Sequence, residues 1–191
     1  MLDRATILFL LLLLTVIVSS HGFVPAPGNT SAIRFSWTIS SMSDSNPHFQ
    51  QSLVLTSATV DQALAAAEQV ALTHGFRVTI AISDAGGVPL LVKRLDGSFP
   101  ASVKVAIGKA ETAALFCKPT GQLESAVNVA DGTSRAALLS APFILMRGGL
   151  PIFLSNGVCV GAVGVSGVKP DEDEQVAMAA VDHITSLVSK L

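Results

Sequence analysis

The run Arg94-Leu95-Asp96-Gly97 places a base and an acid close together in the middle of the chain. A guanidinium group can bind a carboxylate through two parallel hydrogen bonds. Arg94 and Asp96 could therefore face a ligand carboxylate across a pocket. The alternative is structural: the two side chains pair with each other or cap the helix that begins near Pro100.

Lys109 stands among small and apolar residues of a predicted helix. At helical spacing Ser102, Ala106, Lys109 and Ala113 share one face, and Thr112 lies next to it. Such a lysine could reach a ligand at the sheet edge or at a subunit interface, and a desolvated lysine could act as a base or nucleophile. It could instead extend its ammonium group to water.

Gly148 and Gly149 offer backbone N–H groups that no side chain obstructs, which could bind an oxyanion or a carboxylate. A tight connection between strands would need the same two glycines, so both interpretations stay open. The sequence thus gives six candidate ligand-binding residues and assigns none of them a catalytic role: Arg94, Asp96, Lys109, Thr112, Gly148 and Gly149.

The histidines and cysteines do not indicate a metal site. His74 precedes Gly75 at a predicted helix end, where capping explains it, and His183 lies on the last predicted helix, where packing or solvation is favoured over ligation. No two histidines have the spacing of metal ligands. Cys117 and Cys159 are too few for a disulfide framework, and we expect both to be packed as small apolar residues.

Periodicity and turn residues predict a domain in which hairpins dominate and no βαβ repeat occurs. We therefore expect an α+β fold, with an antiparallel sheet covered by helices. The predicted helices span residues 58–73, from 100 or 101 to 116, 123–129, and from 171 to the C-terminus; the predicted strands span 78–82, 88–95, 143–146, 150–154 and 158–165.

The first 51 of the 191 residues are predicted to direct and link the domain rather than to belong to it. An apolar run from Ile7 to Val18 is shorter than the roughly 20 residues of a membrane-spanning helix. Small residues then permit cleavage before Phe23. We expect a signal peptide over 1–22, a disordered linker or transit peptide over 23–51, and one folded domain over 52–191.

The charge of the chain argues against two classes of partner. Its formal net charge is -2, and Lys and Arg form no block. Nucleic-acid-binding proteins carry a basic patch, and anionic membrane surfaces attract clustered bases. We expect a small-molecule ligand, no nucleic acid and, once the signal peptide is removed, no membrane.

Several sequence elements, in this order, resemble those of the GlcG/HbpS-like family, which includes the haem-binding HbpS, the C-terminal domain of PduO, and GlcG. The matches extend over most of the domain, from about residue 57 to 187. They are Asp84-Ala85-Gly86-Gly87, Arg94-Leu95-Asp96-Gly97, Ser102 with Lys109-Ala110-Glu111-Thr112-Ala113, Gly148-Gly149-Leu150-Pro151-Ile152, and Gly161 to Gly167 followed by the acids Asp171 to Glu174.

The resemblance implies a profilin-like domain with a five-stranded antiparallel sheet, assembled as a homo-oligomer. It also implies a small-molecule binding protein with haem or another tetrapyrrole as a candidate ligand. The haem axial ligand stays open between His183 and a weak or non-histidine ligand at a subunit interface. A shared fold does not transfer activity. Two alternatives therefore remain: a metal-independent enzyme using Lys109 with Arg94 on a small carboxylate or carbonyl compound, and an oligomeric interaction module.

The segment after the cleavage site is compatible with two localisations of the protein. Phe23-Val24-Pro25-Ala26-Pro27 resembles the Phe-led junction of plastid presequences in algae with secondary plastids. The alternative is a secreted protein with a flexible N-terminal stalk. Both routes enter the secretory pathway through the same apolar core.

We predict that residues 1–51 fused to a fluorescent protein reach the plastid of a diatom-like host, and that Phe23→Ala diverts the fusion. The substitution leaves the apolar signal core unchanged, so entry into the secretory pathway is retained. Fluorescence microscopy distinguishes the destinations. Appearance of the unmodified fusion in the medium would show that the protein is secreted.

Overall fold

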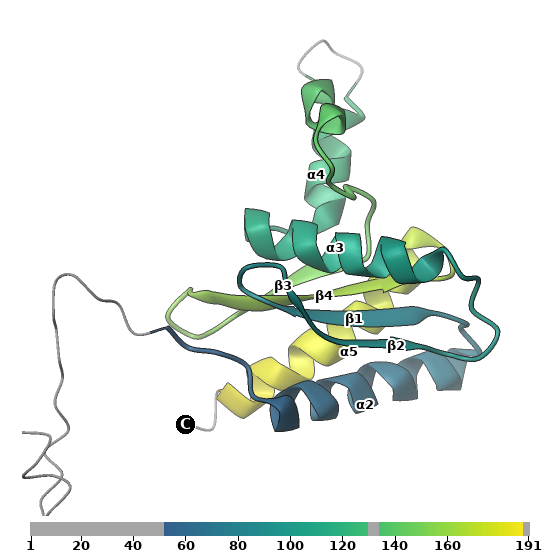
Figure 1. Ribbon diagram of the computed structural model, residues 1–191, viewed down its shortest axis with the longest axis vertical. Coiled ribbons are helices and arrows are strands. Elements are labelled where there is room, and N and C mark those ends of the chain that lie inside the picture. Colours follow the sequence, from purple (N-terminus) through teal and green to yellow (C-terminus); the bar gives the residue numbers. More distant parts are fainter. Residues whose placement is uncertain (1–51, 130–133, 189–191) are drawn as a thin grey trace, which may run out of the picture. The chain divides into compact units, whose positions relative to one another are not determined.

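The computed structural model describes residues 52–129 and 134–188. The predicted signal peptide and linker, residues 1–51, lie outside the described residues, so the address stays a prediction. No helix in the described ranges is both long and apolar enough to cross a membrane. Figure 1 shows the elements in chain order: α2 (Ser57–His74), β1 (Thr79–Asp84), β2 (Pro89–Arg94), α3 (Ser102–Phe116), α4 (Thr120–Val127), the 3-10 helix η1 (Ala136–Ser140), β3 (Gly149–Phe153), β4 (Cys159–Ser166) and α5 (Pro170–Val188).

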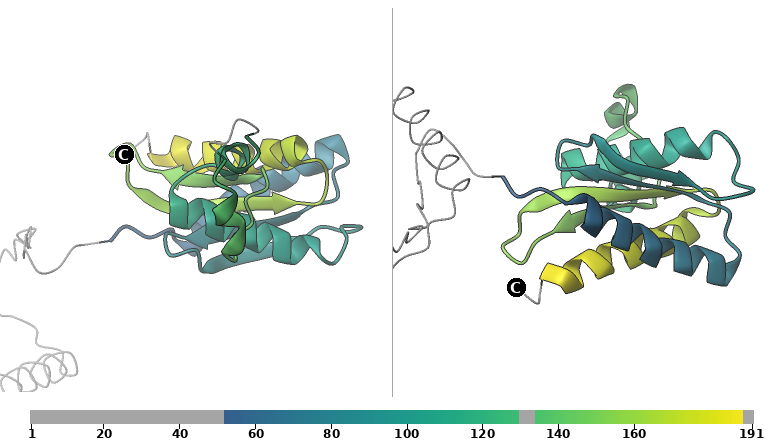
Figure 2. Two further views of the ribbon diagram at one scale, coloured as in Figure 1. Left: turned by 90° about the horizontal axis from the view of Figure 1, so that it is seen from above. Right: turned by 60° about the horizontal axis from the view of Figure 1, so that its bottom comes forward.

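The strands form one antiparallel sheet in the order β2-β1-β4-β3. Helix α3 covers one face of this sheet, whereas α2 and α5 lie side by side on the other face (Figure 2). Helix α4 and η1 project beyond α3 (Figure 1). The predicted α+β class with an antiparallel, helix-covered sheet is confirmed. The prediction of five strands is wrong, because the described sheet has four.

The missing strand is the predicted one at residues 143–146, which the structure shows as an irregular segment. Side chains of neighbouring helices bind one backbone donor within this segment and one just after it. The N–H of Ile144 donates to the hydroxyl of Thr112 on α3 at 3.0 Å. The N–H of Arg147 donates to a carboxylate oxygen of Glu124 on α4 at 2.9 Å. These bonds replace the strand pairing that the apolar composition of the segment suggested.

Local sequence signals explain the remaining elements. The side chain of Thr56 accepts the N–H of Thr59 at the start of α2, and Gly75 ends this helix with a φ of 69°. In the β1–β2 turn, Asp84 accepts the N–H groups of Gly86 and Val88. The predicted short helix begins at Thr120, three residues earlier than the sequence indicated.

The two faces of the sheet pack differently. The face toward α2 and α5 carries β-branched side chains, such as Ile80, Ile82 and Val163, which form the main core. The face toward α3 carries small residues: Ala81 packs on the α3 residues Ala106 and Ala110. Helix α3 therefore lies much closer to the sheet than a helix packed on larger side chains would.

Gly164 is the position where this close approach is tightest. A Cβ atom there would overlap the carbonyl oxygen of Ala106 and the backbone nitrogen of Ala110. Both obstacles are backbone atoms, which a side-chain rotation cannot move. A glycine at this position is therefore required by the packing of α3 on β4.

We predict that Gly164→Ala lowers the free energy of unfolding by about 1–3 kcal/mol, since the added methyl group overpacks the interface. Urea unfolding followed by circular dichroism measures the change. Gly86→Ala is the matched control, because a Cβ at Gly86 meets only Asp84 Oδ1 at an ordinary 3.4 Å. Equal losses in the two variants would contradict the packing argument.

Candidate ligand-binding site

The structure divides the six predicted ligand-binding residues into two groups. Arg94 and Asp96 lie at the exposed end of β2 and in the turn that follows it. The other four are buried between α3 and the β3–β4 pair: Lys109, Thr112, Gly148 and Gly149. The two groups belong to different parts of the fold, so they do not form one site.

Lys109 is fully buried and is bound by β4 and α5. Its Nζ donates to Asp173 Oδ2 at 2.7 Å and to the carbonyl oxygen of Val165 at 2.8 Å. Asp173, 2% exposed, also accepts the N–H of Val168 at 3.1 Å through Oδ1. Burial raises the pKa of the Asp173 carboxyl above its usual range, while hydrogen bonding and charge attraction from Lys109 act in the opposite direction.

Gly148 leaves the space in which this ion pair forms. Its φ is +112°, and a Cβ there would lie 2.8 Å from both Asp173 Cβ and Lys109 Nζ. The N–H of Gly149 donates to Thr120 Oγ1 at 2.9 Å. In the structure, therefore, the two glycines accommodate the ion pair and a helix contact. A role for them in anion binding stays a prediction.

Thr112 has a structural partner on each side. Its hydroxyl donates to the carbonyl oxygen of Gly108 at 2.7 Å and accepts the N–H of Ile144 at 3.0 Å. The side chain thus holds the irregular segment 143–146 against α3. The Thr112 side chain is fully buried.

Arg94 and Asp96 line a cleft of about 470 Å³ at the sheet edge, together with Arg77, Lys93 and Glu68. The Arg94 Nε donates to the carbonyl oxygen of Ser98 at 2.9 Å, so its guanidinium holds the turn after β2. Lys93 pairs with Glu68 at 2.7 Å. The cleft thus contains two of the predicted site residues, and its three bases, Arg77, Lys93 and Arg94, suit a carboxylate.

Arg94 and Lys109 are not brought together. Arg94 lies on the edge strand β2, whereas the Lys109 ammonium contacts Val165 on β4, and β1 separates these strands. The enzyme hypothesis needed both groups at one substrate. The arrangement does not support that combination.

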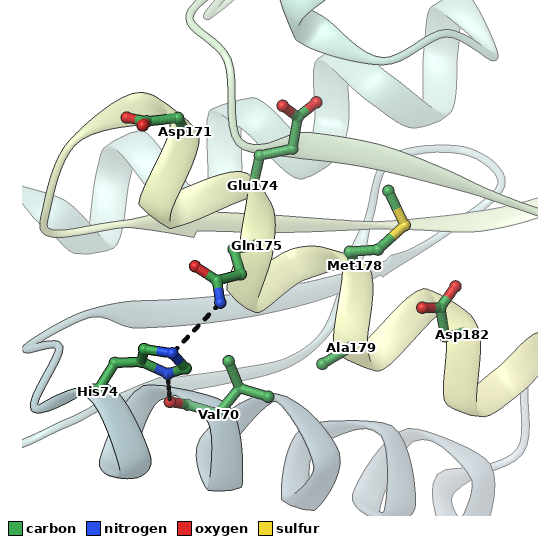
Figure 3. Close-up of a pocket in the computed structure, with 8 residues that line it drawn as sticks. All are labelled: Val70, His74, Asp171, Glu174, Gln175, Met178, Ala179 and Asp182. Carbon is green, nitrogen blue, oxygen red and sulfur yellow. Dashed lines mark hydrogen bonds between the residues drawn. The ribbon is translucent and has the colours of Figure 1, made fainter.

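A second surface pocket, the His74 groove, lies between the end of α2 and the first half of α5 (Figure 3). It has a volume of about 460 Å³. Its lining contains one imidazole, three carboxylates and neither Lys nor Arg. The lining residues are Val70, His74, Asp171, Glu174, Gln175, Met178, Ala179 and Asp182.

The His74 ring is fixed by a hydrogen bond within its own helix. Its Nδ1 lies 2.9 Å from the carbonyl oxygen of Val70, and a carbonyl oxygen can only accept, so Nδ1 carries the proton. The ring also stacks on Phe76 at a centroid distance of 5.2 Å. The Nε2 atom points toward α5, where the Gln175 amide is 3.4 Å away (Figure 3). The sequence interpretation explained His74 by capping, and missed that α5 completes a groove above it.

His183 does not occupy a comparable position. Its Nε2 lies 3.4 Å from Gln62 Oε1, which is a contact between α5 and α2. In the described ranges no group of three or more His, Cys, Asp or Glu residues could hold a metal ion.

A third pocket is apolar and has a volume of about 620 Å³. Its lining carries no charged residue and no side chain of the kind that ligates haem iron. The lining residues are Leu53, Val54, Leu55, Thr56, Thr59, Leu154, Ser155, Asn156, Val160, Ile184 and Leu187.

Comparison with known proteins identifies the class of this domain. Residues 55–182 match the family described as haem degrading protein HbpS-like. The chain is 35% identical to protein GlcG of Escherichia coli K12 over 115 residues, which cover 60% of this chain and 82% of GlcG. The crystal structure of HbpS has 31% identity and a TM-score of 0.65, covering 71% of this chain and 94% of HbpS.

A PduOC–haem complex has the same fold, with a TM-score of 0.60 at 24% identity, covering 69% of this chain and 95% of PduOC. The chain therefore belongs to the HbpS-like family, as its sequence motifs indicated. The homo-oligomer that the resemblance implies stays a prediction.

We predict that Lys109→Met lowers the free energy of unfolding by about 3–5 kcal/mol, because it leaves the Asp173 carboxylate buried without a countercharge. Denaturant unfolding measures the loss. The double variant Lys109→Met/Asp173→Asn should recover part of it, since the amide oxygen can still accept the Val168 N–H. Strictly additive losses in the double variant would contradict a coupled pair.

Proposed function

We propose that this domain is a small-molecule binding protein whose ligand is haem or a related planar tetrapyrrole, bound in the His74 groove. Two comparisons support the choice of ligand. The family is described by haem degradation, and a protein with the same fold forms a haem complex. The choice of the His74 groove rests on residues of this chain.

The observation that carries the proposal is the tautomer and orientation of the His74 imidazole. Metal-ligating histidines typically donate one ring N–H to a carbonyl or carboxylate, which fixes the tautomer and leaves the other nitrogen's lone pair free to bind. The bond from Nδ1 to the Val70 carbonyl is of this kind, and Nε2 faces the groove. The Gln175 amide at 3.4 Å is a weak partner that a ligand could displace.

The residues around His74 limit how haem could be held. Val70 and Ala179 offer apolar contact, and an imidazole is an established axial ligand of haem iron. Asp171, Glu174 and Asp182 would repel the haem propionates, so these groups must remain outside the groove. Met178 is directed away from His74 (Figure 3), so the imidazole alone is assigned as a protein ligand.

We predict that the full chain binds haemin with a saturable shift of the Soret band, and that His74→Ala weakens binding by at least about tenfold. Loss of the axial nitrogen is the cause. Absorption spectroscopy during haemin titration measures both.

His183→Ala is the matched control, because it removes a histidine from the same helix pair outside the groove. This variant should bind haemin as the unmodified chain does. No saturable shift in the unmodified chain would remove haem as the ligand. Equal binding by His74→Ala would show that the ligand lies elsewhere, and the three bases of the Arg94 cleft would then be the next candidates.

A further inference from the structure

The two cysteines of this chain are neighbours in the structure, although 41 residues lie between them. Cys117 ends α3 and is exposed, and Cys159 begins β4 and is half-buried. The Cys117 side chain acts on the Cys159 thiol and raises its pKa, so the two side chains lie near each other. The sequence predicted two separate packed residues and gave no sign of this pairing.

The packing of α3 on β4 explains why the thiols meet. The two elements run in opposite directions: Ala106 and Ala110 of α3 lie over Gly164, and Ala114, further along the helix, packs on Ala162. Cys117 follows Ala110 by seven helical residues, about 10 Å, and Cys159 precedes Gly164 by five strand residues, about 16 Å, so both cysteines lie toward the same end of the α3–β4 contact. Continuing this register brings the end of α3 to the beginning of β4.

A β-bulge decides which face of the sheet Cys159 occupies. In the β3–β4 pairing, Ile152 lies opposite Gly161 but Phe153 lies opposite Cys159, so Val160 is the extra residue. Val160 packs in the core on the α2 and α5 side. In a regular strand the side chains alternate between the two faces. Because Ala162 faces α3, Cys159, three residues earlier, would then face α2 and α5. The bulge instead turns Cys159 toward α3.

We propose that Cys117 and Cys159 form a reversible intramolecular disulfide by exchange with a low-molecular-weight disulfide such as oxidised glutathione. In the first step the Cys117 thiolate attacks one glutathione sulfur, which forms a mixed disulfide and releases one glutathione thiolate. In the second step the Cys159 thiolate attacks the Cys117 sulfur and releases the second glutathione thiolate. The two thiol protons pass to the released glutathiones, so two protein thiols are oxidised while one glutathione disulfide is reduced.

Accessibility sets the order of these steps. Cys117 is exposed at a helix end, where a tripeptide can reach it. Burial raises the pKa of the Cys159 thiol, and the neighbouring Cys117 raises it further, so Cys159 is a poor first nucleophile. Once Cys117 carries the mixed disulfide, however, proximity favours attack by Cys159. Neither residue lines the His74 groove, so the proposal is independent of haem binding.

The test incubates the reduced full chain with excess oxidised glutathione, then counts free thiols by alkylation and intact mass. We expect loss of both alkylatable thiols, a mass lower by two hydrogen atoms, and no retained glutathione. The product should remain a single chain on a non-reducing gel. Dithiothreitol should restore both thiols.

Single variants separate the two steps. Cys159→Ser should stop at the mixed disulfide and keep one glutathione on Cys117, whereas Cys117→Ser should react far more slowly at Cys159. An unmodified chain that keeps both thiols, carries two glutathiones or forms covalent dimers would overturn the proposal. That measurement uses the unmodified chain, so it does not depend on how well the variants fold.

Discussion

The ammonium group of Lys109 is removed completely from water, and removal of a charge from water costs several kcal/mol. Asp173 and the carbonyl of Val165 offset this cost only in one arrangement, with α3, β4 and the first turn of α5 all in place. Gly148 must lack a side chain for the contact to form. The helix on one face of the sheet is thus connected to a helix on the other face through a single ion pair. The acid also lies in the first turn of α5, where the helix dipole favours negative charge.

This ion pair separates the sequence elements that maintain the fold from those that lie at a pocket. The elements concerned are Arg94-Leu95-Asp96-Gly97, Lys109 with Thr112, and Gly148-Gly149. Lys109 and Gly148 are explained by the ion pair, and Thr112 by the segment that it holds. Arg94 alone both fixes a turn and lines a pocket. Motifs that characterise a family can therefore define its fold rather than its ligand.

Features with a local cause could be predicted from the sequence. The β-branched run of β1 followed by Asp84 and Gly87 indicated the first hairpin, and Asn156-Gly157 indicated the second. Features that depend on distant partners could not. The apolar segment 143–146 has the composition of a strand, yet Thr112, 32 residues away, binds its backbone.

The surroundings of the candidate functional residues depend even more on contacts between residues that are far apart in the sequence. Lys109 and its acid are 64 residues apart, and His74 acquires a groove only because α5 lies beside α2. The bulge at Val160 likewise has no signature in a single sequence, although it determines where a thiol points.

The alanine and glycine surface between α3 and the sheet has a further consequence for how such domains can diverge. Gly164 sits so close to α3 that no atom can be added there without moving backbone, so this layer has no spare volume in which a cavity could develop. New binding properties must arise on the outer surfaces, such as the His74 groove between α2 and α5 or the cleft at the β2 edge. Substitutions there leave the interior unchanged. One rigid interior can then support different ligands in different relatives, because recognition and folding draw on separate sets of residues.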